Sequence, residues 1–576
     1  MASARFLSLL LGSALSALAL AAPAEAGRTF YVDHAQGNDA ADGRSAATAW
    51  KHAPGDDRAP AAIRTLVLQP GDRVLFRGGV RYRGTFQPRA AGTADNPVIL
   101  DGSGWGSARA IIDGSRELTD VRRCRSADDC LGAPAWRNLW RATLPEDSHW
   151  SDWLFVDDLP LQAAPFPDLD ARAAADPANF PKVPLSSLAA LQAGSIRHPL
   201  PPGLERGQPV LTLWVIPNML THSSDIRVST SGIEFAGARF EPDPLKPYTD
   251  RDTPFMLMNL PAMVTKPGRF ALSPADRTAI FWPATASAPR DVSIGGRRHG
   301  ISLSRANHLT IQGFSFAKFS GNPQSTSAGS AIRLPGRQQT GITIQHNSFL
   351  SHAGPTGASA VIFALGPRDL VIRHNQFQRL AFNDGIVIDN SEGPVSIRCN
   401  LMAGVGRTAI RLRNVRGGSI ARNRIMDVNS VHGNAISVYG DSREVEVVEN
   451  EVTDSMRPMT VNVASSGTWH QAGEPGILVA RNRFVGSSTV NGPLTSYDAV
   501  PNLRLHDNLF VGPRLSLKLT GRESGFEARG NLLVGTVSIG NRAPIFDGAA
   551  NRLFDAGQAE AVLAATPRPA AGPTCP

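Results

Sequence analysis

The sequence is poor in cysteine, in lysine and in long apolar runs. Only four of its 576 residues are cysteines, and no CxxC or HExxH pattern accompanies them, so no metal site is predicted from motifs. After residue 26, no apolar run approaches the roughly 20 residues that a transmembrane helix needs. Lysine supplies only six of the 58 basic residues, so arginine carries nearly all of the positive charge.

Residues 1–26 have the pattern of a secretory signal peptide. Arg5 gives the positive start, residues 6–21 give the apolar core, and Ala24-Glu25-Ala26 gives the small-residue cleavage site. A membrane anchor is the alternative, but the run is short and rich in alanine and serine. We therefore expect a secreted or periplasmic protein without a membrane span.

In such a compartment the cysteines can form disulfides, and the many arginines can bind an anionic partner. Cys124 and Cys130 lie close together in the sequence, and an oxidising environment favours a disulfide between them. Cys399 is expected to be buried and inert. The net charge of +8 suggests an anionic partner, and an acidic polysaccharide is the natural candidate because nucleic acid is not expected there. A solubilising surface without a specific partner explains the arginines equally well.

One phrase recurs through the second half of the chain: alternating apolar residues, an asparagine, one further residue and another apolar residue. Period-2 alternation inside units of 23 to 32 residues predicts a β-solenoid, whose coils stack about 4.8 Å apart around one core. We expect asparagine at the bends because it tolerates the left-handed region and its amide can bond the neighbouring coils. The repeated asparagines are Asn347, Asn375, Asn400, Asn423, Asn450, Asn482, Asn508 and Asn531.

This repeat resembles the right-handed parallel β-helix of secreted polysaccharide-active proteins, which implies an all-β fold. Residues 27–115 then read as an N-terminal cap and the first coils, and residues 298–555 as the main β-helix. Residues 116–297 lack the repeat and read as an inserted β-rich module. The Ala/Pro-rich residues 556–576 are expected to be a loosely ordered tail.

Two phrases of the insert extend the resemblance to β-helical glycoside hydrolases of the β-xylosidase and α-1,3-galactosidase types. They are Trp153-Leu-Phe-Val-Asp-Asp-Leu-Pro-Leu161 and the segment 267–283, which ends in Ala-Ile-Phe-Trp-Pro. The chain departs from the family phrases where Asp158 stands in place of glycine, and where Phe270-Ala-Leu-Ser replaces Trp-Tyr-Leu-Asp. The resemblance implies an enzyme that binds carbohydrate on one outer face of the coils.

The strand that follows each asparagine strand predicts which side chains share that outer face. Ile386 and Ile388 alternate inward with their equivalents, so the residues between them point outward. The outward set is Arg333, Val387, Asp389, Arg411, Arg413, Ser437, Tyr439 and Asn462. A plain scaffold would carry Thr, Ser and Asn here. The predicted substrate-binding residues are therefore Arg333, Asp389, Arg411, Arg413, Tyr439 and the nearby Arg457.

Three aspartates are the candidate catalytic carboxylates. Asp384 begins one outward-facing strand, whereas Asp427 and Asp454 each lie four residues past a repeated asparagine on adjacent coils, roughly 5 Å apart. Carboxylates about 5 Å apart suit a retaining glycosidase, and carboxylates about 6.5–9.5 Å apart suit an inverting one. Turn-forming aspartates would give the same sequence pattern.

His432 is the candidate general base, because histidine titrates near neutral pH and this one lies in a loop that enters the same face. Its segment resembles the Gly-His-Gly stretch of polygalacturonases, but the Asp-Asp pair and the Arg-x-Lys of that family are absent. A lyase acting on a uronate could use His432 with Tyr439 or an arginine. Lys318 and Lys518, the lysines of the coil region, have no obvious acidic cluster nearby, which argues against a calcium–lysine lyase.

These patterns predict a monomeric, exported enzyme that cleaves glycosidic bonds by hydrolysis with paired carboxylates. No cofactor is expected, with Ca²⁺ considered only for a lyase. A lyase that cleaves an acidic glycan by β-elimination is the first alternative. A non-catalytic glycan-binding or surface-structural solenoid is the second.

Overall fold

The computed structural model is nearly all β and describes residues 27–576 with internal gaps. The expected signal peptide lies outside the described residues. None of the helices in the described part is long and apolar enough to cross a membrane. The gaps are residues 171–172, 174–176, 216–218, 236–239, 241–244, 297–298, 321–328, 337–338, 355–359, 382–383, 429–432, 464–474, 489–491, 497–499, 501, 518–525, 540–549, 573–574 and 576.

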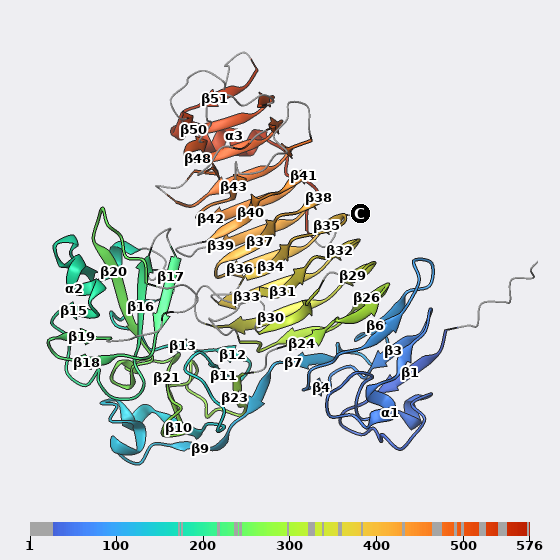
Figure 1. Cartoon of the computed structure of the whole chain (residues 1–576), viewed down its shortest axis with the longest axis horizontal. Helices are drawn as coiled ribbons and strands as arrows, with labels where there is room; N and C mark the ends of the chain where they lie inside the picture. Colours follow the sequence, from blue (N-terminus) through green and yellow to red (C-terminus); the bar gives the residue numbers. More distant parts are fainter. Residues whose placement is uncertain are drawn as a thin grey trace, which may run out of the picture.

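The chain winds into a solenoid whose coils stack along one axis (Figure 1). The repeated asparagines follow the strands of a 12-stranded parallel sheet, here called the Asn sheet. In stacking order its strands are β1 (Thr29–Val32), β3 (Arg73–Phe76), β6 (Val98–Asp101), β26 (Leu309–Gln312), β29 (Ile342–Gln345), β32 (Leu370–Arg373), β35 (Val395–Arg398), β38 (Arg416–Ala421), β41 (Arg443–Val448), β44 (Ile477–Ala480), β47 (Leu503–His506) and β49 (Glu527–Arg529).

The other two strands of each coil belong to a 20-stranded sheet. The middle strands, which follow the asparagines, are β27 (Ser315–Ala317), β30 (Ser348–Ala353), β33 (Gln376–Ala381), β36 (Leu401–Val405), β39 (Arg424–Val428), β42 (Glu451–Ser455), β45 (Arg483–Gly486), β48 (Leu509–Leu517), β50 (Leu532–Ile539) and β51 (Arg552–Phe554). The third strands are β24 (His299–Ser302), β28 (Ser330–Leu334), β31 (Ala360–Leu365), β34 (Asp384–Asp389), β37 (Thr408–Arg413), β40 (Asn434–Gly440), β43 (Met459–Val463) and β46 (Leu494–Thr495). Their outer surface is here called the third-strand face.

The inward side chains of successive coils form one continuous core, as the alternation predicts. Ile386 and Ile388 are completely buried, and so are the equivalent residues of the next two coils, Ile410, Leu412, Ile436 and Val438. Each strand alone is too short to bury an apolar face, so the core exists only because the coils stack in register.

The asparagines form a buried ladder along one corner of the solenoid. The Nδ2 of Asn423 donates to the Oδ1 of Asn450 at 3.0 Å, and the same pairing continues beyond the predicted set to Asn551. The left-handed backbone, however, belongs to the residue before each asparagine, such as His374 (φ 54°) and Cys399 (φ 56°). The expectation that asparagine itself adopts this conformation was wrong. Its role is to satisfy buried backbone groups from coil to coil.

Removal of one ladder amide is expected to be costly. In Asn423→Ala, the backbone N–H and the Nδ2 of Asn400 both lose their acceptor, the Asn423 Oδ1. Buried groups left unsatisfied cost about 1–3 kcal/mol each, so the free energy of unfolding should fall by about 2–5 kcal/mol. Urea denaturation followed by circular dichroism measures this change. An unchanged midpoint would show that the ladder does not stabilise the solenoid.

The first coils and the main solenoid are continuous in space although they are far apart in sequence. β6 pairs with β26, and β7 (Ile111–Asp113) pairs with β27. Near the N-terminus, α1 (Ala61–Arg64), β2 (Val67–Leu68), β4 (Arg81–Tyr82) and β5 (Arg89–Ala91) complete the early coils, with β25 (Arg305–Asn307) beside β5. The first coil after residues 116–297 therefore stacks directly on the last coil before them.

The intervening residues form a separate β-rich module beside the coils (Figure 1). Its base is the antiparallel pair β8 (Ser115–Glu117) and β23 (Val292–Gly295). Its apolar core includes Phe155 and packs against Ala353 and Ala381, at the ends of β30 and β33. Its other elements are β9 (Thr119–Arg123), β10 (Trp140–Thr143), β11 (Trp153–Val156), β12 (Leu159–Pro160), β13 (Gln162–Ala163), β14 (Lys182–Val183), α2 (Leu188–Gln192), β15 (Ser195–Arg197), β16 (Val210–Val215), β17 (Met219–Ser223), β18 (Arg227–Ser229), β19 (Gly232–Glu234), β20 (Thr253–Met258), β21 (Arg269–Ser273) and β22 (Thr278–Phe281).

The structure explains why Asp158 can stand where the related phrase has glycine. Asp157 and Asp158 form the turn between β11 and β12 with φ of 48° and 65°, a left-handed conformation that aspartate tolerates. The Asp158 carboxylate lies 2.8 Å from the Nζ of Lys318 and 2.7 Å from a guanidinium nitrogen of Arg81. This turn therefore ties the insert to the coils.

Lys318 also corrects one expectation from the sequence, because it does have acidic neighbours. Its Nζ lies 2.6 Å from Asp291 as well as 2.8 Å from Asp158, and the side chain is completely buried. The acidic neighbours come from the insert, so they are distant in sequence. A buried lysine held between two carboxylates is not free to reach a substrate. Lys518 lies outside the described residues.

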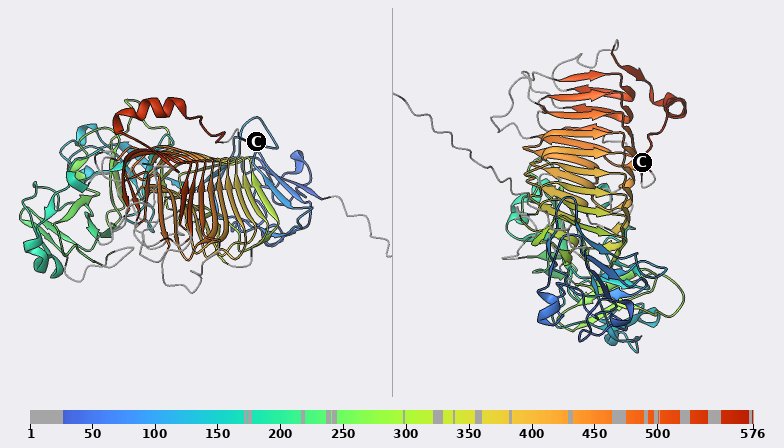
Figure 2. Two further views of the ribbon diagram at one scale, coloured as in Figure 1. Left: turned by 90° about the horizontal axis from the view of Figure 1, so that it is seen from above. Right: turned by 90° about the vertical axis from the view of Figure 1, so that its right-hand side faces the viewer.

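The C-terminal tail differs from the loosely ordered segment that we expected. It contains α3 (Ala559–Ala565) and then runs back along the edges of the coils (Figure 2). The Arg483 guanidinium donates to the carbonyls of Leu563 and Thr566, and the N–H of Gly572 donates to the carbonyl of Arg422 at 2.9 Å. The tail thus returns across several coils toward the N-terminal part of the solenoid.

Two disulfides are present in the structure. The expected bond between Cys124 and Cys130 is confirmed. Cys399 is buried, but the expectation that it is chemically inert was wrong, because it pairs with Cys575 across 176 residues of sequence. The pairing could not be foreseen from an alanine- and proline-rich tail that gave no sign of lying against the coils.

Candidate functional site

The third-strand face brings the predicted outward residues into two stacked rows. The first row contains Arg333, Phe363, Val387, Arg411, Ser437, Thr460 and Thr495. The second contains Leu365, Asp389, Arg413, Tyr439 and Asn462. The register therefore confirms that these residues share one face. It also adds Phe363, which forms a small apolar cluster with Val387 and Ala360, separate from the main core.

Asp384 lies at the centre of a buried charge cluster at the start of β34. Its Oδ2 is 3.1 Å from Arg407 and 3.3 Å from Arg411, and its Oδ1 accepts the N–H of Thr408 at 3.0 Å. The Asp384 side chain is 1% exposed, and both arginines are buried. A carboxylate in this setting is held rigidly, and two guanidinium groups stabilise its negative charge.

The contact with Asp384 also shifts the pKa of Arg411. Burial acts to lower the pKa of Arg411, but the charge of Asp384, with smaller effects from Tyr439 and Asp389, raises it above the usual value. The guanidinium of Arg411 is therefore held as a cation beside the Asp384 carboxylate, which joins the side chains of neighbouring coils at this corner.

Asp427 and Asp454 stack on adjacent coils as the spacing predicts. The neighbouring pairs Met426–Thr453 and Val428–Ser455 are in register around them. Both aspartates are exposed, and both have a left-handed backbone conformation, with φ of 56° and 47°. They share this conformation with Ser351, Arg379 and Gly404 at the same corner of earlier coils. The geometry of this corner therefore explains the left-handed backbone conformation of the two aspartates. Their catalytic role stays a prediction.

The remaining predicted residues occupy the edges of the face or lie outside the description. Asp389 is buried and forms an ion pair with half-exposed Arg413 at 2.6 Å, next to Tyr439 on the following coil. Burial lowers the pKa of Arg333, whose guanidinium lies 3.4 Å from the Nε2 of His299. His432 lies outside the described residues.

Sequence reasoning missed a column of polar residues at the start of the third strands. Asp384 and Thr408 each lie two residues before the registered pair Ile386–Ile410. Thr408 pairs in register with Asn434. Asn434 and Arg457 in turn lie two residues before the registered pair Ile436–Met459. The structure also adds Arg407, which reaches Asp384 from the next coil. A clue was available, because Arg407 immediately precedes an aligned strand and is charged where the equivalent residues Asn383, Gly433 and Met456 are uncharged.

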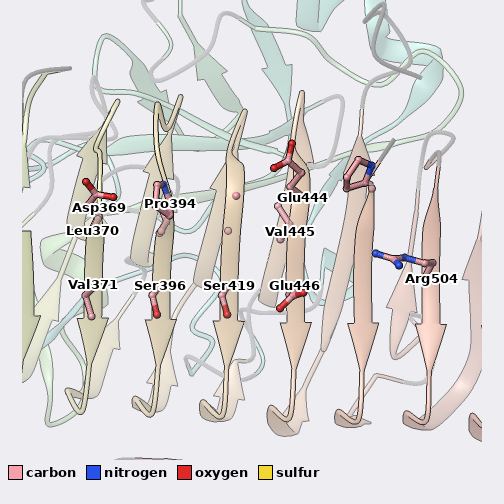
Figure 3. Close-up of a pocket in the computed structure, with 15 residues that line it drawn as sticks. Asp369, Leu370, Val371, Pro394, Ser396, Ser419, Glu444, Val445, Glu446 and Arg504 are labelled. Carbon is pink, nitrogen blue, oxygen red and sulfur yellow. The ribbon is translucent and has the colours of Figure 1, made fainter. Parts of the chain in front are cut away.

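A second concave surface lies on the opposite side, over the Asn sheet. It is an open groove of about 570 Å³ above β32, β35, β38 and β41 (Figure 3). Ser396 and Ser419 line its floor, whereas Glu444, Glu446 and Arg504 stand along it. None of the predicted site residues lines it, and Glu444 already pairs with Arg416 at 3.0 Å. We therefore take the third-strand face, with its buried charges, as the candidate site.

Two buried titratable groups away from this face have strongly shifted pKa values. Burial raises the pKa of Asp152 to about 7, even though its carboxylate accepts the N–H of His149. Burial lowers the pKa of His352 to about 3, and the ring stacks on Phe319 while its Nε2 faces the carbonyl of Phe316 at 3.1 Å.

These two groups predict opposing effects of pH on stability. The contribution of Asp152 is complete below pH 4 and is lost as the pH rises toward 7, because only the unfolded state ionises in that range. The contribution of His352 is complete above pH 6.5 and is lost as the pH falls toward 3. Between pH 4 and 6.5, Asp152→Asn should therefore gain stability relative to the parent as pH rises, whereas His352→Gln should lose it. Thermal melts across this range measure both slopes, and parallel curves for all three proteins would contradict the assignment.

Within the described residues, no group of three or more His, Cys, Asp or Glu side chains is placed to hold a metal ion.

Comparison with known proteins supports the solenoid. Residues 290–484 match the family model described as a right-handed β-helix region. No curated protein sequence matches the chain. Among solved structures, one titled "Glycoside hydrolase" is 13% identical, with 90% of this chain and 98% of that chain covered and a TM-score of 0.47.

Two further solved structures are similar at low sequence identity, the second over less than half of this chain. A complex of XylC with xylose is 11% identical over 92% of this chain and 86% of that one, with a TM-score of 0.43. PfbA, a surface adhesin of Streptococcus pneumoniae, is 13% identical over 44% of this chain and 62% of that one, with a TM-score of 0.27. Such similarities carry no argument about activity. The stacked parallel sheets and the family match together identify the chain as a right-handed parallel β-helix protein.

Proposed function

We propose that this protein cleaves glycosidic bonds of a polysaccharide or oligosaccharide by hydrolysis, with the sugar chain bound along the third-strand face. The observation that carries the proposal is the buried Asp384 carboxylate, fixed by Arg407 and Arg411 beside rows of outward polar groups. A rigid anion of this kind can stabilise the oxocarbenium-like transition state of glycoside cleavage, or attack it as a nucleophile. The insert phrases that resemble β-helical glycoside hydrolases point to the same chemistry.

The proton donor in this proposal comes from Asp427, Asp454 or His432. Asp427 lies two coils from Asp384, which offsets the two residues by roughly 10 Å along the solenoid axis, and pairing them would correspond to an inverting enzyme. Asp427 and Asp454 lie one coil apart, roughly 5 Å, which is the separation of retaining enzymes. The anomeric configuration of the first product, followed by NMR, distinguishes the two pairings.

A lyase acting on an acidic glycan is the second candidate, and the arginines of the face favour it. β-Elimination requires a cation to neutralise the uronate carboxylate while a base removes the C5 proton. Arg411 is a buried cation in the first outward row, and Arg457 is a buried cation just before β43. In this candidate, His432 or Tyr439 supplies the base.

A panel of neutral and acidic polysaccharides separates the candidates. Hydrolysis releases reducing ends without absorbance from an unsaturated product, and we expect this result. Reducing ends accompanied by that absorbance would assign a lyase instead. Binding without either product would leave a non-catalytic glycan-binding or surface-structural solenoid.

A further inference from the structure

One buried cation just before β43, at the edge of the third-strand face, has no counter-charge among the described residues. Among the described residues, five arginines are buried: Arg269, Arg407, Arg411, Arg457 and Arg483. Four of them have acceptors, namely Asp168 for Arg269, Asp384 for Arg407 and Arg411, and backbone carbonyls of the tail for Arg483. Arg457 is 7% exposed, and its guanidinium has no hydrogen-bond or ion-pair partner in the described part of the chain. An arginine that is mostly buried and lacks an acceptor within the described protein is unusual, and a bound anion would supply that acceptor.

Other unsatisfied polar atoms gather on the same face. Thr495 Oγ1 and Asn462 Oδ1 are buried without partners, and so is the Nε of Arg411. Thr495 stacks directly on Thr460, which lies three residues after Arg457. Of the Arg457 nitrogens, only Nε is both sealed from solvent and unpaired, so the two terminal nitrogens remain reachable. A ligand that reaches this point would therefore meet the two terminal guanidinium nitrogens of Arg457.

We infer that Arg457 binds the anionic group of an acidic sugar, a carboxylate or a sulfate ester, at a subsite displaced along the solenoid axis from Asp384. The planar guanidinium matches a two-oxygen anion through paired hydrogen bonds. Three coil steps separate Asp384 from Arg457 in the polar column, roughly 14 Å between backbone positions. The anionic sugar is therefore not the ring beside Asp384 but a neighbour along the chain. This inference rests on the proposed function only in placing the sugar chain on this face.

The test compares binding of matched sugar chains by calorimetry. The probes are uronic acid oligosaccharides, the same chains after carboxyl reduction, and sulfated chains of similar length. Wild-type protein should bind one anionic class about 10–100-fold more tightly than the neutral chains, and Arg457→Gln should remove that preference. Arg457→Lys should retain only part of it, because a point charge replaces the fork. Whichever anionic class shows the preference identifies the anion.

The matched control is Arg398→Gln, which removes the same charge from an exposed position on the Asn sheet. It should bind as the wild type does. Arg457→Gln should also melt no earlier than the wild type, because no acceptor loses its donor. Equal affinity for acidic and neutral chains, or an equal loss in Arg398→Gln, would overturn the inference.

Cleavage assays on the same proteins keep the two proposals separate. If neutral chains are hydrolysed and Arg457→Gln changes nothing, the acidic subsite is wrong and the hydrolase proposal stands. If no chain is cleaved but anionic binding still depends on Arg457, the subsite stands and the hydrolase proposal fails.

Discussion

Asp384→Asn should abolish turnover and also weaken the fold. Loss of a charge that acts on the reacting centre is expected to reduce kcat by roughly 10³-fold or more. The same change leaves Arg407 and Arg411 beside a neutral amide in a buried site, and an uncompensated buried charge costs about 3–5 kcal/mol.

The two effects are separated by measuring activity only where the variant is folded. Turnover is assayed well below the melting temperature of Asp384→Asn, with circular dichroism as the check on folding. Asp389→Asn is the matched comparison, because it removes a buried carboxylate from the same strand. Its partner, Arg413, is half-exposed and can turn to water, so the loss of stability should be smaller. Undiminished turnover in folded Asp384→Asn would rule out Asp384 as a catalytic residue.

Removal of the Cys399–Cys575 disulfide should destabilise the protein more than removal of the other one. The double variant Cys399→Ser/Cys575→Ser opens a loop that spans 176 residues. The chain-entropy account gives roughly 5 kcal/mol for a loop of that length. The tail should also detach more readily from the coils, because the hydrogen bond from Gly572 to Arg422 loses the covalent link beside it. Denaturant unfolding measures the first effect, and limited proteolysis between α3 and the C-terminus measures the second.

The double variant Cys124→Ser/Cys130→Ser is the control, because it also removes one disulfide but opens only a short loop. These cysteines are six residues apart, for which the same account gives roughly 2 kcal/mol. The tail should stay protected from protease in this variant. Equal losses in the two double variants, or a reversed order, would count against the loop-length argument.

The fold was predictable from the sequence because its determinants are local and repeated. Alternation places Ile386 and Ile388 inward, and the recurring asparagine marks each corner, so register follows from counting. The break in the repeat after the first coils likewise indicates the insert. These features need no knowledge of which distant segments touch, since each coil contacts its neighbours in the same way.

Tertiary structure alone decided which candidate residues act together. The partners of Asp384 lie 23 and 27 residues away, on the next coil, and the neighbours of Lys318 come from the insert. No sequence repeat predicts that the tail returns to the coils and brings Cys575 to Cys399. Alternation says which face a side chain occupies, but not whether its charge finds a partner there. Arg411 is paired with Asp384, whereas Arg457 has no partner among the described residues. This difference depends on long-range packing and not on the period of the sequence repeat.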